Sequence, residues 1–249
     1  MNLLLLEPAE VERGEARVGG RRARHLLDVL RVQPGAVLRA GIVDGPRGHA
    51  TVLAVAPDSV RLHIDCNEPG RDLDGGPDAG HDVLLLAVPR PKVLARILEH
   101  AAALGYRHIV LFRSWKVEKS HLGSRALRPE VQRAHLLLGL EQGQRTHLPE
   151  VHFFALFRPF VEDQLAVLPL PAHRFCAHPA AATATAELRL SQGAPFALAL
   201  GPDGGFVPYE VEQLAARGFL PVRLSGSPLR TESALSALHG QLDLLRQQR

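Results

Sequence analysis

The chain has 249 residues, 29 Lys and Arg against 26 Asp and Glu, and a hydrophobic fraction of 46%. This length suits one large domain or two modest ones with a real core, and the 5% aromatic content indicates a core of Leu, Val and Ala. No apolar run approaches the roughly 20 residues of a membrane-spanning helix. The opening residues 3–6 are too short for a signal peptide and are predicted to form a first strand.

Residues 1–66 are predicted to form a small β-barrel with one helix. Strand-like runs occupy residues 37–43, 50–55 and 60–64, and a helix is expected over residues 22–30. Residues 67–81 contain four Gly, two Pro and four acidic residues, which is typical of a linker.

Residues 82–249 alternate between strands and helices. Strands are predicted at 83–88, 108–112, 151–155, 173–177, 196–200 and 222–224, and helices at 92–104, 130–141, 161–168, 208–217 and 233–246. This order favours a mostly parallel α/β sheet covered by helices. Ligands of such sheets bind outside the carboxyl ends of the strands.

Cysteine and histidine usage bears on compartment and metal binding. Cys66 and Cys176 are far apart without metal-ligand spacing, so we expect two free thiols in a reducing cytoplasm. The thirteen His residues form no HxxxH pattern. We therefore expect them at the surface and predict no metal site.

Basic residues concentrate in two segments. Arg17, Arg21, Arg22, Arg24 and Arg31 lie in the first, and residues 107–133 hold seven Lys or Arg against Glu118 and Glu130. Two such stretches could follow a phosphate backbone. The alternative is a solvated face that keeps the protein soluble.

A glycine-rich loop follows the predicted strand 196–200. It reads Gly201-Pro-Asp-Gly-Gly-Phe206, and Pro208 suits the first turn of the next helix. Glycine permits close backbone approach and positive φ, so this loop can surround a ligand with backbone groups. The alternative is a tight turn that binds nothing. No Lys or Ser/Thr follows as in a P-loop.

A second loop, residues 223–234, leads into the last helix. Thr231 is a good N-cap for that helix, and Arg230 and Glu232 lie beside its start, either as a structural pair or as functional groups. Two such loops after successive strands indicate a common ligand between them.

These segments together resemble a known family. Gly-Pro-Asp-Gly-Gly-Phe at 201–206, followed by Leu-Ser-Gly-Ser-Pro-Leu-Arg-Thr-Glu-Ser-Ala at 224–234, is similar to the RsmE family of uridine-N3 methyltransferases of bacterial 16S ribosomal RNA, in the SPOUT superfamily. Residues 25–35 resemble its PUA-like segment, and Glu141-Gln-Gly-Gln-Arg145 its Glu-Gln-x-x-Arg signature. The resemblance covers nearly the whole chain.

The resemblance implies a PUA-like RNA-binding barrel (1–66) and a SPOUT methyltransferase domain with a trefoil knot (82–249), in a homodimer that binds S-adenosylmethionine. The implied cofactor-binding residues are Leu200, Gly201, Pro202, Gly204, Gly205, Leu224, Ser225, Gly226, Leu229, Arg230 and Thr231. The implied catalytic residues are Arg230 and Glu232. The expected RNA-binding residues are Arg22, Arg24, His25, Arg31, Lys92, Arg113, Lys116, Lys119 and Arg145.

The chain departs from the family pattern at several positions. Asp203 stands where Glu is usual, Val207 where Ser is common, and Ser233 where Thr is usual. Without Ser at 207, the cap of the following helix must come from elsewhere. His100 and Ala103 replace the usual Lys and Glu, which leaves the RNA-side contacts less defined than the cofactor site.

The expected mechanism assigns charge stabilisation on the uracil oxygens to Arg230. Glu232 could act as base or orient Arg230; orientation is favoured because a carboxylate paired with Arg is a poor base. The expected partner is small-subunit ribosomal RNA in the assembled subunit. No membrane association is expected. The alternatives are a SPOUT enzyme that methylates a ribose 2′-oxygen and an RNA-binding assembly factor without catalysis.

Overall fold

The structure, a computed structural model, describes residues 2–69 and 81–248. The chain divides into two compact units: Met1–Pro77 with Leu137–Leu148, and Asp78–Leu136 with Pro149–Arg249. Nothing in the sequence indicated that residues 137–148 belong to the first unit. Of the expected linker, residues 70–80 lie outside the described residues, and the last strand of the first unit takes in Asn67 and Glu68.

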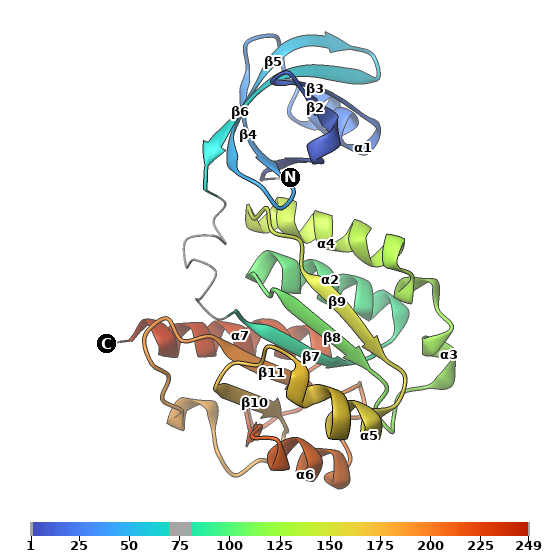
Figure 1. Cartoon of the computed structure of the whole chain (residues 1–249), viewed down its shortest axis with the longest axis vertical. Coiled ribbons are helices and arrows are strands. Elements are labelled where there is room, and N and C mark those ends of the chain that lie inside the picture. The colour runs from blue at the N-terminus through green and yellow to red at the C-terminus, as the bar shows by residue number, and fades with distance from the viewer. Residues whose placement is uncertain (1, 70–80, 249) are drawn as a thin grey trace. The chain divides into compact units, whose positions relative to one another are not determined.

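The first unit is built on a six-stranded mixed sheet. Its strands are β1 (Leu4–Leu6), β2 (Val11–Glu12), β3 (Glu15–Gly19), β4 (Val37–Ile42), β5 (Arg47–Ala56) and β6 (Ser59–Glu68). They run in the order β1-β4-β5-β6-β3-β2, with β1 and β4 parallel and the other neighbours antiparallel. Figure 1 shows that the sheet curls round on itself. Its core includes Leu6, Val18 and Leu62.

The hairpin of β2 and β3 was not predicted. Arg13 and Gly14 form its turn with φ of 52° and 79°, which is the positive-φ pair of a two-residue hairpin turn. Arg-Gly is not one of the residue pairs that normally announce such a turn. The strands themselves are short and carry charged residues on their outer face, so their pattern is weak.

One short helical segment lies where the helix of the first unit was predicted, at residues 22–30. It consists of α1 (Gly20–Arg24) and a π-helical turn, η2 (His25–Val29), after a 3₁₀ turn, η1 (Pro8–Glu10). The buried carboxylate of Glu141 accepts a hydrogen bond from Arg21 at 2.7 Å, and its backbone oxygen accepts one from the Leu3 amide at 3.1 Å. These contacts tie the Glu-Gln-x-x-Arg segment to β1 and α1.

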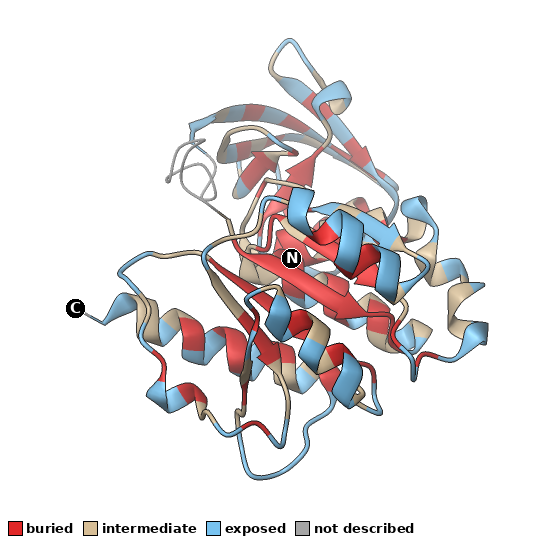
Figure 2. Ribbon diagram, turned by 60° about the horizontal axis from the view of Figure 1, so that its bottom comes forward, coloured by how far each residue is buried: buried red, intermediate tan, exposed pale blue. Residues whose placement is uncertain are grey.

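The second unit is the predicted parallel α/β sheet. Its strands are β7 (Val83–Ala87), β8 (His108–Phe112), β9 (Glu150–Phe154), β10 (His173–Ala177), β11 (Phe196–Leu200) and β12 (Leu220–Val222), in the order β12-β10-β11-β7-β8-β9. Every neighbouring pair is parallel. All five residues of β7 and of β11 are buried, and Figure 2 shows these buried strands beneath helices whose outer faces are exposed.

Helices cover this sheet and connect its strands. They are α2 (Pro91–Leu104), α3 (Lys119–Leu122), α4 (Pro129–Gly143), α5 (Phe157–Pro159), α6 (Pro208–Ala216) and α7 (Thr231–Gln247), with short turns η3 (Arg125–Leu127), η4 (Phe160–Gln164), η5 (Leu165–Val167) and η6 (Thr185–Glu187). The helix expected over 161–168 is split among α5, η4 and η5. The strand expected at 222–224 ends at Val222 instead.

An ion pair between half-buried Arg246 and buried Asp82 holds the end of α7 to the residue that precedes β7. Arg246 donates to both carboxylate oxygens of Asp82 at 2.9 and 3.0 Å, and the Phe196 amide donates to the same carboxylate at 3.0 Å. Burial raises the pKa of Asp82, and the charge of Arg246 opposes that rise. The pair stabilises α7 at its far end from the candidate site.

Two further expectations concern membranes and thiols. Within residues 2–69 and 81–248, none of the helices has the length and apolar character that crossing a membrane requires. Cys66 and Cys176 are both free, as predicted. Burial raises the pKa of Cys66 to about 11 and that of Cys176 to about 12, so both remain protonated at neutral pH.

Candidate functional site

A cavity of about 510 Å³ opens in the second unit at the carboxyl ends of β10, β11 and β12. Its walls come from the segments that follow these three strands and from the start of α7. The strands lie side by side and point the same way, so the loops after them converge. The volume is in the range of small-molecule sites.

The cavity gathers most of the predicted cofactor residues. Among them it is lined by Leu200, Gly201, Pro202, Gly204, Gly205, Leu224, Ser225, Leu229 and Thr231. Gly226 and Arg230 are not part of the lining. Both predicted loops therefore contribute walls to one cavity.

The geometry of the first loop explains two of its glycines. A Cβ on Gly201 would lie 2.9 Å from the backbone nitrogen of Phe206, closer than real Cβ atoms approach. Gly205 has φ of 67°, which side chains disfavour, and its amide donates to the Pro202 oxygen at 2.7 Å. The loop therefore folds back tightly on itself, which leaves backbone facing the cavity.

Glu210 holds this loop to the segment after β8, and the sequence reasoning missed it. Its buried carboxylate accepts hydrogen bonds from the Val207 amide at 3.0 Å, the Ser114 hydroxyl at 3.0 Å and the Trp115 amide at 2.8 Å. The bond from Val207 supplies the cap that the sequence lacked at the start of α6. A Glu three residues after a cap position is a recognisable signal for this arrangement.

Lys116 belongs to the cavity, although the sequence placed it on the RNA side only. Its Nζ donates to the Gly204 oxygen at 2.7 Å, and its side chain is part of the lining. Nearby, Asp203 forms an exposed ion pair with Arg90 at 3.0 Å. The glycine loop is thus held from both sides by charged groups.

The start of α7 differs from the expectation in two ways. Arg230, not Thr231, is the N-cap residue, and Thr231 is a buried first residue of the helix. Glu232 accepts a hydrogen bond from Arg96 of α2 at 2.8 Å, a partner that the sequence did not indicate. Arg230 itself is exposed to solvent at this helix start.

The state of Glu232 follows from its contacts. A hydrogen bond from its own backbone amide, Arg96 and the charge of Arg230 lower the pKa of its carboxyl group, in that order, against the opposing effect of burial. A carboxylate with a lowered pKa is a weak proton acceptor. The geometry favours a positioning role for Glu232 over that of a base.

The predicted RNA-binding residues of the first unit differ in availability. Arg22 donates to the carboxylate of Glu10 and to the Leu5 oxygen at 2.8 Å, so its guanidinium is engaged within the unit. Arg24 and Arg31 are exposed, whereas His25 and Arg145 are half-buried. Arg24 and Arg31 are therefore the most accessible of these predicted RNA-binding residues.

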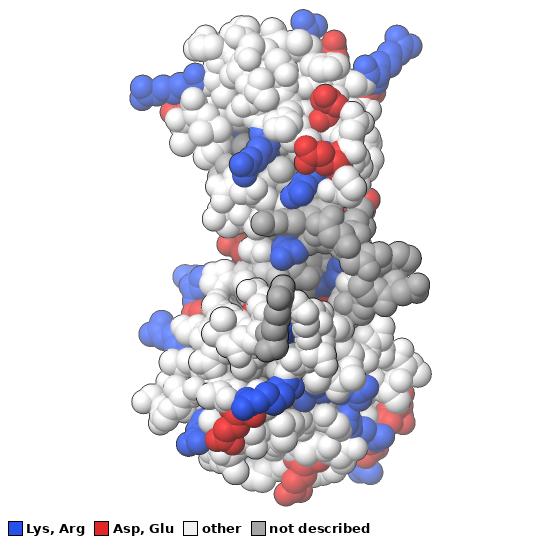
Figure 3. Space-filling model, turned by 90° about the vertical axis from the view of Figure 1, so that its left-hand side faces the viewer, with Lys and Arg blue, Asp and Glu red and all other residues white. Residues whose placement is uncertain are grey.

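In the second unit, Lys92 and Lys119 are exposed and Arg113 is half-buried. Figure 3 shows one face on which Lys and Arg lie among Asp and Glu in both units. An RNA contact on such a face would depend on individual side chains more than on an unbroken positive field.

The third wall of the cavity was not predicted at all. Residues Ala177, His178, Pro179 and Ala180 follow β10 and line the cavity, together with apolar groups such as Phe206 and Leu238. The sequence predicted β10 as a strand of the same sheet, but it did not indicate that β10 lies beside β11. That adjacency depends on the order of the strands in the folded sheet.

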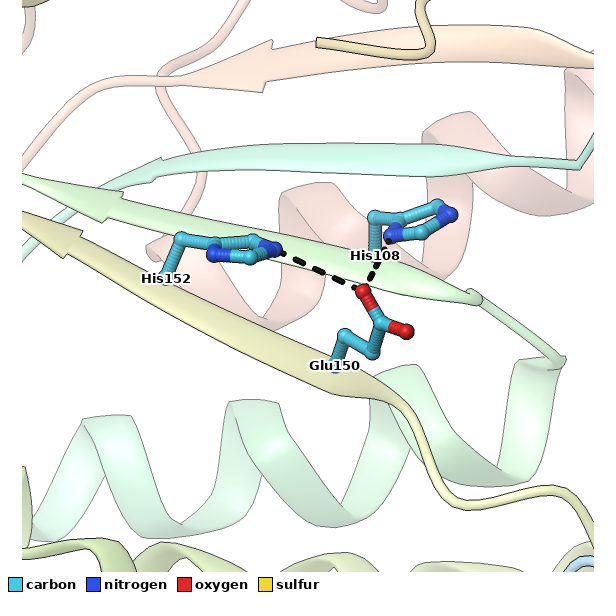
Figure 4. A group of neighbouring side chains, drawn as sticks. All are labelled: His108, Glu150 and His152. Carbon is cyan, nitrogen blue, oxygen red and sulfur yellow. Dashed lines mark ion pairs between the residues drawn. The ribbon is translucent and has the colours of Figure 1, made fainter.

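A group that resembles a metal-ligand set lies elsewhere in the second unit. His108, Glu150 and His152 are carried by β8 and β9, and Glu150 Oε2 is 3.4 Å from His108 Nδ1 and 3.6 Å from His152 Nε2, as Figure 4 shows. His108 and Glu150 face each other across the strands, a pairing that sequence spacing does not reveal. They begin their strands, whereas the cavity lies where strands end, so the group is outside the candidate site.

The pKa of His108 predicts a pH effect on stability. Burial lowers this pKa, His152 and Arg107 add to the lowering, and Glu150 opposes it. The unfolded chain then binds this proton more readily than the folded one. As pH falls below the ordinary histidine value of about 6.5, folding stability should decrease until the lower folded pKa is passed.

Replacing His108 with Gln should reduce that pH dependence. Urea unfolding of the wild type and the His108→Gln variant at pH 5 and pH 7.5 measures it. Equal losses of unfolding free energy in the two proteins would contradict the assignment.

The fold and site define a class of protein: a two-unit chain whose parallel α/β sheet carries a glycine-lined ligand cavity at its carboxyl edge. The family model for the RNA methyltransferase domain matches residues 79–243. The chain is 30% identical to the ribosomal RNA small subunit methyltransferase E of Treponema pallidum over 95% of this chain and 88% of that protein. It therefore belongs to the RsmE family of RNA methyltransferases.

One more sequence relative and one solved structure are consistent with this family membership. The methyltransferase E 1 of Borreliella burgdorferi is 26% identical over 62% of this chain and 63% of that protein. The crystal structure of the methyltransferase E of Neisseria gonorrhoeae, bound to S-adenosyl methionine, superposes with a TM-score of 0.72 at 21% identity over 98% of each chain. The structural similarity shows that the two proteins share a fold.

Proposed function

We propose that the chain transfers a methyl group from S-adenosylmethionine to N3 of a uridine in small-subunit ribosomal RNA. The observation that carries this proposal is the single cavity that both glycine-containing loops enclose at the carboxyl edge of the sheet. Family membership supports the reaction class. The names of the relatives support the cofactor and the RNA.

The cavity residues suit the methyl donor. The glycine loop and the segment after β12 present backbone groups, which can read an adenine edge, and Leu200, Leu224 and Leu229 supply apolar walls. The donor supplies an already activated methyl group on a sulfonium. The protein's task is to hold donor and acceptor in line, which accounts for much of the rate enhancement in such transfers.

The acceptor side is assigned to the start of α7. Uracil N3 must lose a proton before its lone pair can attack, and negative charge then spreads to the adjacent oxygens. Arg230 is exposed next to cavity-lining Leu229 and Thr231, so its guanidinium can stabilise that charge. Arg96 and Glu232 fix the helix start that carries it.

The RNA contacts follow from the substrate. N3 lies on the pairing edge of uracil, so the target must be unpaired or extruded. The first unit, with Arg24 and Arg31, and the basic segment after β8 would hold neighbouring phosphates. The assembled small subunit as substrate, the homodimer and the trefoil knot remain predictions of the resemblance.

Gly201→Ala should weaken S-adenosylmethionine binding by at least about tenfold, because the new Cβ would force the Phe206 backbone away from its place. Calorimetric titration measures the change. Gly240→Ala in α7 is the matched control, since a Cβ there meets open space and should leave affinity unchanged. Wild-type affinity in Gly201→Ala would show that the loop does not line the donor site.

A calorimetric titration of the purified wild-type chain with S-adenosylmethionine tests the proposal first. Saturable binding is expected, weakened by at least about tenfold in Gly201→Ala and unchanged in Gly240→Ala. An absence of binding would contradict the proposal and favour the non-catalytic assembly factor. Mapping the methylated atom then separates uridine N3 from a ribose 2′-oxygen.

A further inference from the structure

Trp115 is the single tryptophan of the chain, and it lies in the segment after β8, which ends at Phe112, with 83% of its surface exposed. Scattered exposed apolar residues are ordinary on protein surfaces. This one differs because nearby residues on both sides of it in sequence are anchored. Ser114 and Val117 are buried, so the ring projects from a segment that is itself packed.

Three contacts fix the backbone that carries the ring. The Trp115 amide donates to Glu210 Oε1 at 2.8 Å, and the Ser114 hydroxyl donates to Glu210 Oε2 at 3.0 Å. On the other side, Lys116 Nζ donates to the Gly204 oxygen at 2.7 Å. The exposed indole is therefore held on a rigid support, which lowers the entropy cost of stacking a ligand on it.

The position of the ring relates it to the cavity. Lys116, the next residue, lines the cavity and touches the glycine loop. Trp115 thus belongs to the segment that borders the site on the side of β8. A flat, exposed aromatic group at the border of a cavity can hold a planar group just outside it.

The charges around the ring indicate the kind of ligand. Arg113, Lys116 and Lys119 surround Trp115 in sequence, with Glu118 the one acidic residue among residues 113–119. Aromatic rings interleaved with basic side chains are the chemistry that binds single-stranded nucleic acid, with bases stacked on rings and phosphates paired with cations. Neither the cofactor residues nor the charge-stabilising Arg230 uses this ring.

We propose that Trp115 is a stacking site for an unpaired RNA base of the segment whose target nucleotide enters the cavity, with Lys116 and Arg113 pairing with its phosphates. The inference rests on the proposed function and adds the group that positions the acceptor strand. It assigns substrate binding, not the chemical step, to Trp115.

The presence of one tryptophan makes the test direct, because its fluorescence reports this ring alone. We expect decauridylate, added at low salt, to quench the emission of the wild-type chain. Replacement of the ring should weaken RNA binding by about tenfold in Trp115→Leu and by much less in Trp115→Phe, which keeps an aromatic face. With unmethylated small subunits, KM should rise in Trp115→Leu while kcat changes little.

Controls separate this role from others. Phe153→Leu removes a different exposed aromatic ring of the second unit, on β9, and should leave RNA affinity unchanged. Trp115→Leu should keep wild-type affinity for S-adenosylmethionine and a wild-type melting temperature. A shifted sedimentation coefficient in Trp115→Leu would make the ring a contact between copies of the chain and overturn the proposal.

The remaining outcomes distinguish the two proposals. Unquenched emission together with an unchanged KM in Trp115→Leu would refute the stacking site, while turnover by the wild type would leave the proposed function intact. A wild type that is quenched by RNA yet methylates no ribosomal RNA would refute the proposed function and leave the stacking site standing.

Discussion

Replacing Arg230 with Ala should reduce methyl transfer by roughly 100-fold or more, while affinity for S-adenosylmethionine stays within about threefold of wild type. The side chain is exposed and outside the cavity lining, so its loss removes no donor contact that the cavity provides. Its backbone oxygen accepts the Ala234 amide at 2.8 Å. That bond survives the substitution, and the start of α7 should stay in place.

Single-turnover kinetics with unmethylated small subunits measure the rate of methyl transfer. Calorimetric titration of the variant with S-adenosylmethionine measures the affinity. Arg230→Lys should recover part of the rate, because a point charge replaces the planar guanidinium. Arg217→Ala, an arginine substitution at the C-cap of α6 and outside the cavity lining, is the matched control and should keep the wild-type rate. A near-normal rate in Arg230→Ala would remove this residue from the chemistry.

Replacing Glu210 with Ala should destabilise the protein by about 2 to 5 kcal/mol, because it leaves buried hydrogen-bond donors without their acceptor. The carboxylate receives the Val207 amide, the Ser114 hydroxyl and the Trp115 amide. Val207 lies at the end of the glycine loop, and Ser114 and Trp115 lie in the segment after β8. Affinity for S-adenosylmethionine should therefore fall as well, although Glu210 does not line the cavity.

Urea unfolding measures the loss of stability, and titration of the folded variant at low temperature measures the loss of affinity. Glu210→Gln should have the smaller effect, since one side-chain oxygen remains to accept. Glu212→Ala, two residues further along α6, is a matched control that should change neither quantity. Wild-type stability in Glu210→Ala would show that the buried carboxylate does not hold the two segments together.

The strands of the second unit were the most predictable part of the fold. Those at 108–112, 173–177 and 196–200 match β8, β10 and β11 residue for residue. β8 after His108 and the whole of β11 are short apolar runs bounded by polar or turn-forming residues, and burial on both faces of a parallel sheet requires such runs. β10 is less regular, since it begins with half-buried His173 and Arg174. The weak β2–β3 hairpin lacks this signal, because its charged residues alternate with small apolar ones.

The site was predicted where a residue type itself carries the information. Gly201 and Gly205 occupy positions that tolerate no side chain or need positive φ, so their presence in sequence indicated the loop. The wall at residues 177–180 and the pairing of Glu232 with Arg96 carry no such mark. They arise from strand order and from contact between α2 and α7, which are tertiary properties.

We propose that the cavity of the second unit serves methylation of a small-subunit ribosomal RNA uridine at N3. Mass mapping of 16S ribosomal RNA from cells that lack this gene, complemented by wild type or by Arg230→Ala, tests it most directly. We expect one N3-methyluridine that is missing without the gene, is restored by the wild type and stays missing with Arg230→Ala. An unchanged set of methylated nucleotides, or loss of a ribose 2′-O-methyl group instead, would contradict it.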